Sequence, residues 1–232
     1  MVILQKPEQP KYTYSFKSNK LVKNYFKDLN KRGLGDTAND IALYGSKLYI
    51  VVNVSSTIEV IDFQTGISIK QIPMFTDNGS SRQPRHIAFY ENKAYVCSFD
   101  GTVARIDTTS LQIESFTKAG RNPENICVKN KKLYVSNSGG LDYSEGLGVD
   151  NTVSVIDIES FTEIKKIEVG PNPGCISPGP DEAVYVATYG SNIADGDFNF
   201  VKINSQTDEV ERIYNEKVMN FAIDNNLSLI HI

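Results

Sequence analysis

A short pattern occurs four times along this chain, and it constrains the fold more than any other feature. Each copy has an apolar core that contains a tyrosine, followed by a second apolar segment that ends in Asp or Asn. The cores lie at residues 48–51, 94–97, 133–136 and 184–187, and the second segments at 57–62, 102–107, 152–157 and 199–204. Repeats of roughly 40 to 50 residues with several short strands each are typical of β-propellers. We therefore predict an all-β fold, a β-propeller of four-stranded antiparallel blades.

Turn chemistry divides each repeat into four strands. In the first repeat, Gly45-Ser46 and Gln64-Thr65-Gly66 are turn sequences between apolar segments. The aspartates that end the third strands are Asp62, Asp107 and Asp157, and each is followed within three residues by Thr or Ser. Because Asp can accept hydrogen bonds from the backbone just after it, we expect each aspartate to stabilise its own turn.

A proline recurs between repeats, three residues before the expected start of the next inner strand. It is found in Gln83-Pro84-Arg85-His86-Ile87, in Asn122-Pro123-Glu124-Asn125-Ile126 and in Asn172-Pro173-Gly174-Cys175-Ile176. Proline has no amide donor and a fixed φ, so it interrupts a strand ladder. We predict that these segments carry the chain from the outer edge of one blade to the inner edge of the next.

We predict a single propeller domain with complete repeats at 39–75, 84–119, 123–170 and 174–215. In residues 1–38 we expect a hairpin of outer strands, 12–16 paired with 21–26, followed by a connection to the first repeat. Residues 216–232 begin a further repeat, with strands at 221–225 and 227–232. The last segment also looks like translated adapter sequence, so we expect a fragment of a larger propeller. Either the terminal hairpins join to close a five-bladed ring, or blades are missing and the sheets form an open arc. We favour the arc.

Composition excludes several classes of function. The 232 residues are 40% hydrophobic, which is enough for a sizeable core, and no apolar run approaches the roughly 18 residues of a membrane helix. The net charge of −4 does not favour nucleic acid as a partner. Only His86 and His231 are histidines, Trp is absent, and no glycine-rich phosphate loop occurs. A Ser-His-Asp triad or a histidine metal site would rest on His86 alone, so we predict a binding protein and not an enzyme.

Two long loops, 137–151 and 189–197, connect the second and third strands of their repeats, where the first two repeats need only a few residues. In a propeller these connections share one face with the crossings between blades. Long ordered loops on a rigid scaffold are where binding concentrates, and aromatic and amide groups there suit a large planar ligand. The predicted ligand-binding residues are Asn53, Arg85, His86, Phe99, Asp100, Arg121, Asn137, Tyr143, Asn172, Tyr189 and Asn192.

Two further interpretations concern titratable groups. A lone histidine beside Arg85 at the start of a blade is more often a hydrogen-bonded structural residue, and His86 fits that description. The loops also contain carboxylates at Asp142, Glu145 and Asp150, and in Asp195-Gly196-Asp197, which are oxygen ligands of the kind that calcium takes. Their spacing fits no EF-hand, so we predict no cofactor and no metal site.

Several motifs carry a family resemblance. Tyr134-Val135-Ser136-Asn137, residues 151–159 and Ile167-Glu168-Val169-Gly170 are similar to the YVTN-type repeat of YncE-like bacterial β-propellers. More narrowly, residues 35–49 and 132–140 resemble the surface propeller lipoproteins of gut Bacteroidetes, which include a corrinoid-capturing protein that sits on an outer-membrane cobalamin transporter. The resemblance spans roughly residues 12–226. It implies a seven-bladed, non-enzymatic protein of the cell surface or periplasm, lipid-anchored when intact, with a corrinoid as ligand and a transporter as partner.

Two other functions stay open on the sequence. The loop face could instead dock another envelope protein, which would make the chain an interaction scaffold. A metal-dependent propeller hydrolase or lactonase is less well supported, because it requires carboxylates from several blades to converge on the central channel, and the sequence shows no such set.

Overall fold

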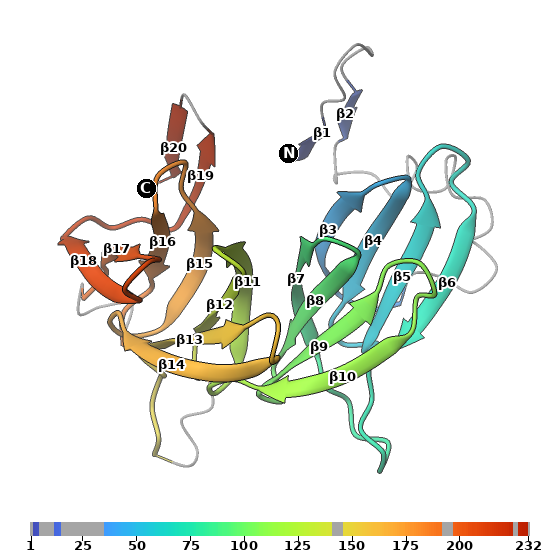
Figure 1. Cartoon of the computed structure of the whole chain (residues 1–232), viewed down its shortest axis with the longest axis horizontal. Coiled ribbons are helices and arrows are strands. Elements are labelled where there is room, and N and C mark those ends of the chain that lie inside the picture. Colours follow the sequence, from blue (N-terminus) through green and yellow to red (C-terminus); the bar gives the residue numbers. More distant parts are fainter. Residues whose placement is uncertain are drawn as a thin grey trace.

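The computed structural model describes residues 2–4, 12–14, 35–140, 146–191, 197–224 and 227–231. These residues contain β-strands and no helix. The strands form four antiparallel sheets of four strands each and two sheets of two strands each. Figure 1 shows the four larger sheets side by side as blades around a common centre. The predicted all-β fold of four-stranded antiparallel blades is confirmed.

The four blades are consecutive in sequence, and the first strand of each is the innermost. Blade 1 consists of β3 (Ala38–Tyr44), β4 (Lys47–Val52), β5 (Thr57–Asp62) and β6 (Ser68–Pro73). Blade 2 consists of β7 (Pro84–Tyr90), β8 (Lys93–Ser98), β9 (Thr102–Asp107) and β10 (Ile113–Lys118). Blade 3 consists of β11 (Pro123–Lys129), β12 (Lys132–Asn137), β13 (Thr152–Asp157) and β14 (Thr162–Glu168). Blade 4 consists of β15 (Pro173–Pro178), β16 (Ala183–Thr188), β17 (Phe200–Asn204) and β18 (Glu209–Tyr214).

The two-stranded sheets lie beside the ends of this series. Strand β1 (Val2–Leu4) pairs with β2 (Tyr12–Tyr14), so 12–14 have a different partner from the expected one; 21–26 lie outside the described residues. Strand β19 (Asn220–Asp224) pairs with β20 (Leu227–His231), and β19 contacts the inner strand of blade 4. The two small sheets are not hydrogen-bonded to each other, so the described sheets form an open arc and not a closed five-bladed ring (Figure 1).

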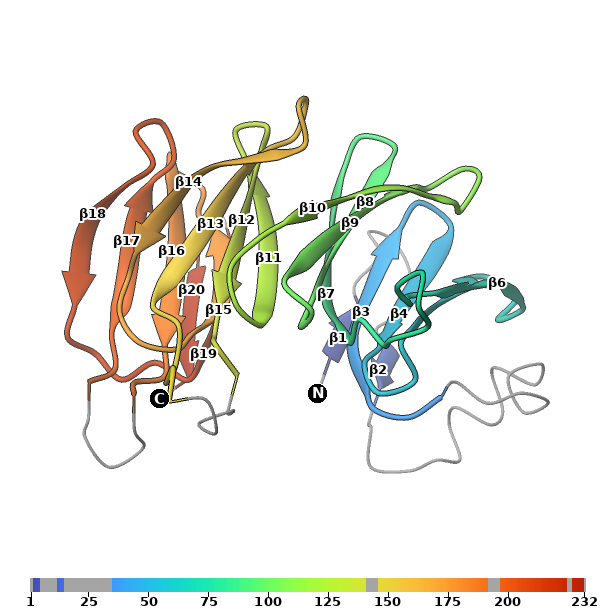
Figure 2. The same cartoon turned by 90° about the horizontal axis from the view of Figure 1, so that it is seen from below.

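The connections alternate between two faces of the arc. Tight turns join first to second and third to fourth strands on one face. On the other face, longer loops join the second strand of each blade to the third, and further connections join each blade to the next. The described parts of these connections in blades 3 and 4 lie along the lower edge of Figure 2. We call this second surface the loop face. Its position agrees with the sequence prediction that both kinds of long connection share one surface.

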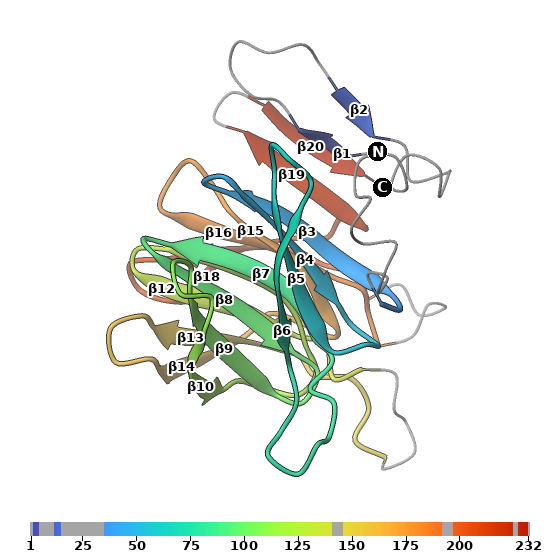
Figure 3. The same cartoon turned by 90° about the vertical axis from the view of Figure 1, so that its right-hand side faces the viewer.

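A third enlarged loop, residues 74–83 between β6 and β7, was not predicted. It forms a small hairpin with a bridge between Phe75 and Ser81 and a 2.9 Å bond from Thr76 N to Ser80 O, and it projects from the sheets (Figure 3). The turn sequence Asp77-Asn78-Gly79 was the available signal. The loop face therefore has one more ordered projection than the sequence analysis assigned to it.

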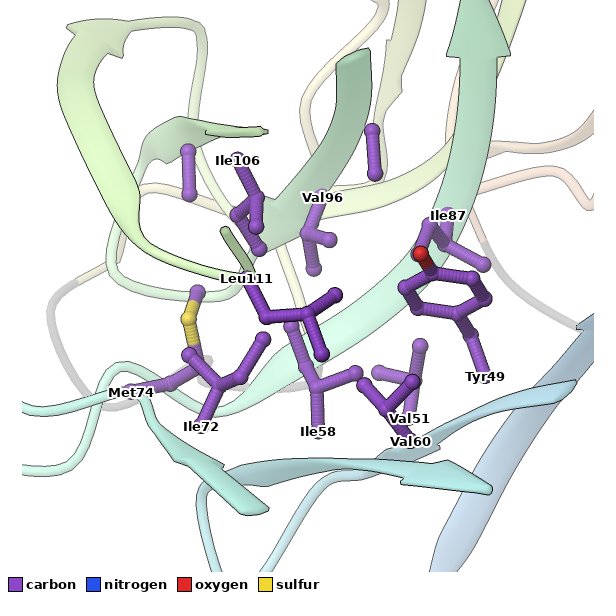
Figure 4. Packing of buried hydrophobic residues seen from close by; sticks show 12 residues of the cluster. Tyr49, Val51, Ile58, Val60, Ile72, Met74, Ile87, Val96, Ile106 and Leu111 are labelled. Carbon is purple, nitrogen blue, oxygen red and sulfur yellow. The ribbon is translucent and has the colours of Figure 1, made fainter. Parts of the chain in front are cut away.

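The core consists of side chains packed between successive blades. Figure 4 shows the first such layer, in which Tyr49, Val51 and Ile58 of blade 1 lie against Ile87 and Val96 of blade 2. Similar buried clusters join blade 2 to blade 3, and blade 3 to blade 4. Because blades pack on both faces of a sheet, the middle strands are apolar on both faces, which explains the mixed pattern in the sequence.

The repeated tyrosines are contacts between blades. Tyr95 lies 5.8 Å from Phe161 of the next blade, measured between ring centroids. In the corresponding place, the hydroxyl of Tyr134 donates to the carboxylate of Asp208, which also forms a 2.6 Å ion pair with Lys132. Burial and the hydrogen bond to Asp208 raise the pKa of Tyr134. A structural position that is aromatic in one blade is thus polar and ion-paired in another.

The aspartates that end the third strands stabilise their turns, as predicted. Asp62 Oδ1 accepts from Thr65 N at 2.8 Å, and Asp157 Oδ1 accepts from Ser160 N at 2.7 Å. These backbone bonds lower the pKa of both carboxyl groups. In blade 4, Asn204 makes the same kind of bond with a neutral amide, to Gln206 N at 2.8 Å.

The prolines require a correction. Pro84, Pro123 and Pro173 are themselves the first residues of β7, β11 and β15, and they do not precede these strands by three residues. Proline is tolerated at the first position of a strand because the missing N–H leaves no ladder bond unmade there. The irregularity that follows each proline lies within the strand and belongs to the candidate site.

The turn aspartates predict a pH dependence of stability. The folded pKa of Asp62 and of Asp157 is below the unfolded value of about 3.9, so ionisation stabilises the fold above that pH, and the stabilisation is lost as the pH falls through the folded pKa. We expect the double variant Asp62→Asn/Asp157→Asn to lose less stability between about pH 5 and pH 2 than the wild type. Urea unfolding at a series of pH values measures this. Asn204→Asp should steepen the dependence, and identical slopes in all three proteins would contradict the assignment.

Two tyrosines allow a matched test of the contacts between blades. Tyr134→Phe removes the donor to Asp208 and should lower the free energy of unfolding by about 1–3 kcal/mol. The hydroxyl of Tyr49 is buried without a hydrogen-bond partner among the described residues, so Tyr49→Phe should leave stability unchanged or slightly raised. Urea unfolding at neutral pH compares the two variants. Equal losses would show that the Tyr134 hydroxyl contributes nothing specific.

Candidate functional site

The inner strands of blades 1 to 3 each contain a β-bulge at the same place. In β7, Pro84 pairs with Ser98 and His86 with Cys97, which leaves Arg85 without a partner in the ladder. Asn39 in β3 and Glu124 in β11 occupy the corresponding unpaired positions. We call Asn39, Arg85 and Glu124 the bulge row. Bulges re-aim side chains and are frequent beside functional sites, so this row is the centre of the candidate site.

Hydrogen bonds join the bulge row into one polar line across three blades. Arg85 Nη1 donates to Asn39 Oδ1 at 2.8 Å, and Asn39 Nδ2 donates to the carbonyl of Arg85 at 3.0 Å. Arg85 Nη2 forms an ion pair with Glu124 Oε1. The guanidinium also lies over the ring of Phe99, 4.4 Å from the ring centroid. Arg85 and Phe99, both predicted from the sequence, are therefore together, whereas Asn39 and Glu124 were missed.

In blade 4 an aromatic ring takes the place of the bulged side chain. Strand β15 is irregular between Pro173 and Ile176, and the corresponding residue is Gly174. A Cβ atom on Gly174 would lie 2.1 Å from Cε2 of Tyr189, so the ring of Tyr189 rests on this glycine. The Tyr189 hydroxyl accepts a 3.3 Å bond from Cys175 N. Burial raises the pKa of Tyr189, and Cys175 and then the carboxylate of Glu124 add to the effect.

The crossings between blades hold the loop face together. Gln83, Asn122 and Asn172, which precede the three prolines, have positive φ values of 54°, 45° and 55°. Their carbonyls accept bonds from Phe99 N at 3.0 Å, Ser138 N at 3.1 Å and Tyr189 N at 2.9 Å, respectively. Each crossing is thus bonded to the loop between the second and third strands of its own blade. These bonds fix the backbone of Phe99 and of Tyr189 at the start of their loops.

Arg121 anchors the first of the two long loops. Its Nη2 donates to Gly148 O at 2.9 Å, and its backbone N donates to Asp150 Oδ2 at 3.3 Å. In the second loop, Asp197 accepts from the backbone and hydroxyl of Ser191 at 3.0 and 2.6 Å. The predicted ligand-binding residues Tyr143 and Asn192 lie outside the described residues.

A second ion pair lies where blades 1 and 2 form the loop face. Arg82 Nη1 is 2.5 Å from Asp100 Oδ2, and Arg82 Nε donates to Phe75 O at 3.3 Å. The pair joins the projecting hairpin to the turn between β8 and β9. Asp100 was predicted as a ligand-binding residue, and Arg82 was missed because the sequence analysis did not assign the hairpin that it supports.

Three predicted site residues are used by the fold. Asn137 is fully buried: its Oδ1 accepts from Gly120 N at 3.1 Å and its Nδ2 donates to Thr152 and Ser154 hydroxyls at 3.0 Å. Asn53 is also buried, and its amide donates to Pro84 O at 3.1 Å. His86 Nδ1 is 2.6 Å from the carbonyl of Glu124, as expected for a hydrogen-bonded structural histidine. We therefore assign Asn53, His86 and Asn137 to contacts within the arc.

Two kinds of feature are absent from the described residues. Among them, no three or more His, Cys, Asp or Glu side chains are grouped so that they could hold a metal ion. The same part of the chain contains no helix long and apolar enough to cross a membrane.

Solved structures with a similar fold include natural and designed proteins. Hydrazine synthase from Kuenenia stuttgartiensis matches with a TM-score of 0.66 at 18% identity, over 79% of this chain and 51% of that chain. Dihydro-heme d1 dehydrogenase NirN in complex with DHE matches at 0.58 and 12%, over 78% and 38% of the two chains. The computationally designed Ika8 protein matches at 0.53 and 15%, over 86% and 69%. At these identities the likeness shows the β-propeller fold alone, and the chain spans about half or less of the two enzymes.

No curated protein matches the chain. A family model described as "Domain of unknown function (DUF5074)" matches residues 12–223, a range that contains all four blades and the bulge row. This chain, an arc of β-propeller blades, belongs to the DUF5074 family.

Proposed function

We propose that this DUF5074 protein is a non-enzymatic binding protein that recognises a small molecule on its loop face, along the bulge row. The observation that carries the proposal is that equivalent positions of three adjacent inner strands present an amide, a guanidinium and a carboxylate, with the ring of Tyr189 next in line. A repeated fold does not require these three different groups at its bulges. Their variety is what recognition of an asymmetric ligand requires.

The bulge row is held in place before any ligand binds. Arg85 is fixed by Asn39, by Glu124 and by the ring of Phe99. Groups that are already immobilised lose little conformational entropy on binding, so preorganisation favours affinity. Arg121 and Asn172 lie at the edge of the same face, where they border the described parts of the two long loops.

For the ligand we propose a corrinoid, captured for an outer-membrane transporter at the cell surface or in the periplasm. The proposal is supported by the sequence resemblance to surface propeller lipoproteins, and by aromatic rings beside hydrogen-bonding groups, which suit a flat macrocycle. NirN, whose structure is a complex with DHE, has a similar fold, but at 12% identity that likeness adds nothing on the ligand of this chain.

Cyanocobalamin tests this proposal by isothermal titration. We expect micromolar binding to the wild-type chain and roughly five- to tenfold weaker binding to Tyr189→Ala, because stacking on an aromatic ring contributes about 1–1.5 kcal/mol. Tyr44→Ala is the matched control, since Tyr44 stacks on Phe89 at the opposite end of the inner strand. Absence of heat at micromolar ligand would remove the corrinoid assignment. Equal weakening by both variants would remove Tyr189 from the site.

A second candidate function is that of a scaffold for another envelope protein. Val54, Phe75 and Leu147 are 56%, 43% and 57% exposed, and all three lie in connections of the loop face. Exposed apolar side chains on a face with long connections could contribute to a protein interaction site. This function differs from the first in using the apolar tips of the loops and not the polar row between them.

Charged substitutions separate this alternative from small-molecule binding. We expect Phe75→Asp/Leu147→Asp to abolish co-purification of an envelope partner if the face is a protein interface, because an unpaired charge is costly to bury. Ile164→Asp is the control, since Ile164 is 52% exposed on the outer strand β14 and lies away from the loop face. A partner retained by the double variant, or lost equally in the control, would contradict the scaffold function.

A further inference from the structure

The junction of blades 3 and 4 contains a carboxylate, that of Glu124, of which only one oxygen has a partner among the described residues. Glu124 Oε1 pairs with Arg85, whereas no described residue donates to Glu124 Oε2. The Glu124 side chain is 20% exposed, so it is held largely within the structure and still reaches the surface. A carboxylate accepts hydrogen bonds at both oxygens, and Oε2 therefore has unused accepting capacity.

An aromatic ring lies on the other side of this junction. The inner strands β11 and β15 are in contact, and Glu124 and Gly174 occupy corresponding positions in them. Tyr189 rests on Gly174, and the place that it fills is open only because residue 174 has no side chain. Burial is the main cause of the raised pKa of Tyr189, and the carboxylate of Glu124 makes a smaller contribution in the same direction.

We propose that Glu124 and Tyr189 form a subsite for an N–H donor, an ammonium or a primary amide, carried beside a flat apolar group. Glu124 Oε2 accepts the N–H bond, and the ring of Tyr189 packs against the flat group. This inference rests on the proposed binding function, and it names the part of the ligand that lies between blades 3 and 4. Primary amides on the rim of a planar macrocycle satisfy this description.

The local charges favour a donor over an anion. A ligand carboxylate at this position would lie beside Glu124, and like charges at contact distance repel. The guanidinium of Arg85 already serves Asn39 and Glu124, and it is stacked on Phe99. Arg121 is likewise bonded to the backbone of the loop, at Gly148. Among the described residues, Glu124 Oε2 is therefore an acceptor with capacity left at this junction, whereas the donor Arg85 Nε, which also has no partner there, is buried.

Three small probes of the same shape test the subsite by saturation-transfer NMR on the whole chain at neutral pH. Benzylamine carries an ammonium, benzamide a neutral amide and benzoate a carboxylate. We expect benzylamine and benzamide to give signals at least roughly threefold stronger than benzoate. Equal or stronger signals from benzoate, or no signal from any probe at millimolar concentration, would overturn the proposal.

Variants assign the preference to the two residues. Glu124→Gln keeps an acceptor for Arg85, removes the charge and places an NH2 donor where Oε2 was, so the benzylamine signal should fall to the level of benzoate or below, while benzamide is retained because its carbonyl can accept from that NH2. Tyr189→Leu should weaken all three probes. Asp157→Asn, in a turn on the opposite face, is the control and should change none. An unchanged benzylamine signal in Glu124→Gln, with an unchanged melting temperature, would overturn the role of Glu124.

Cyanocobalamin titration separates this inference from the proposed function. If cyanocobalamin gives no heat and the probes still depend on Glu124, the corrinoid assignment fails and the subsite stands. If cyanocobalamin binds equally to the wild type and to Glu124→Gln, and the probes show no preference, the binding function stands and the subsite fails.

Discussion

Peptide carbonyls on the inner strands are bonded by side chains of the preceding blade, and the arrangement of the arc depends on this interaction. The carbonyls of Arg85, Glu124 and Gly174 bond to Asn39 Nδ2 at 3.0 Å, His86 Nδ1 at 2.6 Å and Ser136 Oγ at 2.6 Å. A peptide group with no ladder partner is costly to bury unless something else satisfies it. Amide, imidazole and hydroxyl groups meet the same requirement, so the sequence can vary here while the spacing of the blades is kept.

The same interaction places the candidate site. The carbonyls concerned belong to the residue after each proline, which is the bulged residue in blades 2 and 3. Because the preceding blade holds that peptide, the bulged side chain is directed by the backbone and its identity is free to change. Asn39, Arg85 and Glu124 use this freedom, and their hydrogen bonds to one another make the row rigid. The fold and the proposed recognition thus share one set of residues but use different atoms of them.

The fold could be predicted because its signals are local. The period of the repeat, the aspartates of the turns and the shared face of the long connections all follow from short stretches of sequence. The bulge row could not, because an extra residue in a strand is visible only from its pairing with the next strand. The position after each proline was the available signal, and it led to Arg85 but not to Glu124. Asn53 and Asn137 misled because a polar residue at a strand end looks the same in sequence whether the ladder buries it or leaves it free.

At some positions one blade has a different side chain from the others, and the consequence depends on whether a neighbouring residue satisfies the new polar group. Tyr134 contacts Asp208 at the place where Tyr95 contacts the ring of Phe161. Lys132 forms an ion pair with Asp208, so the carboxylate has its partners within the fold. Gly174 and Tyr189 also replace a regular feature, yet they leave the second oxygen of Glu124 without a donor among the described residues. A compensated departure preserves packing, which selection for stability alone explains. An uncompensated one leaves a polar atom for solvent or a ligand to satisfy, and among the described residues the junction of blades 3 and 4 has such an atom in Glu124 Oε2.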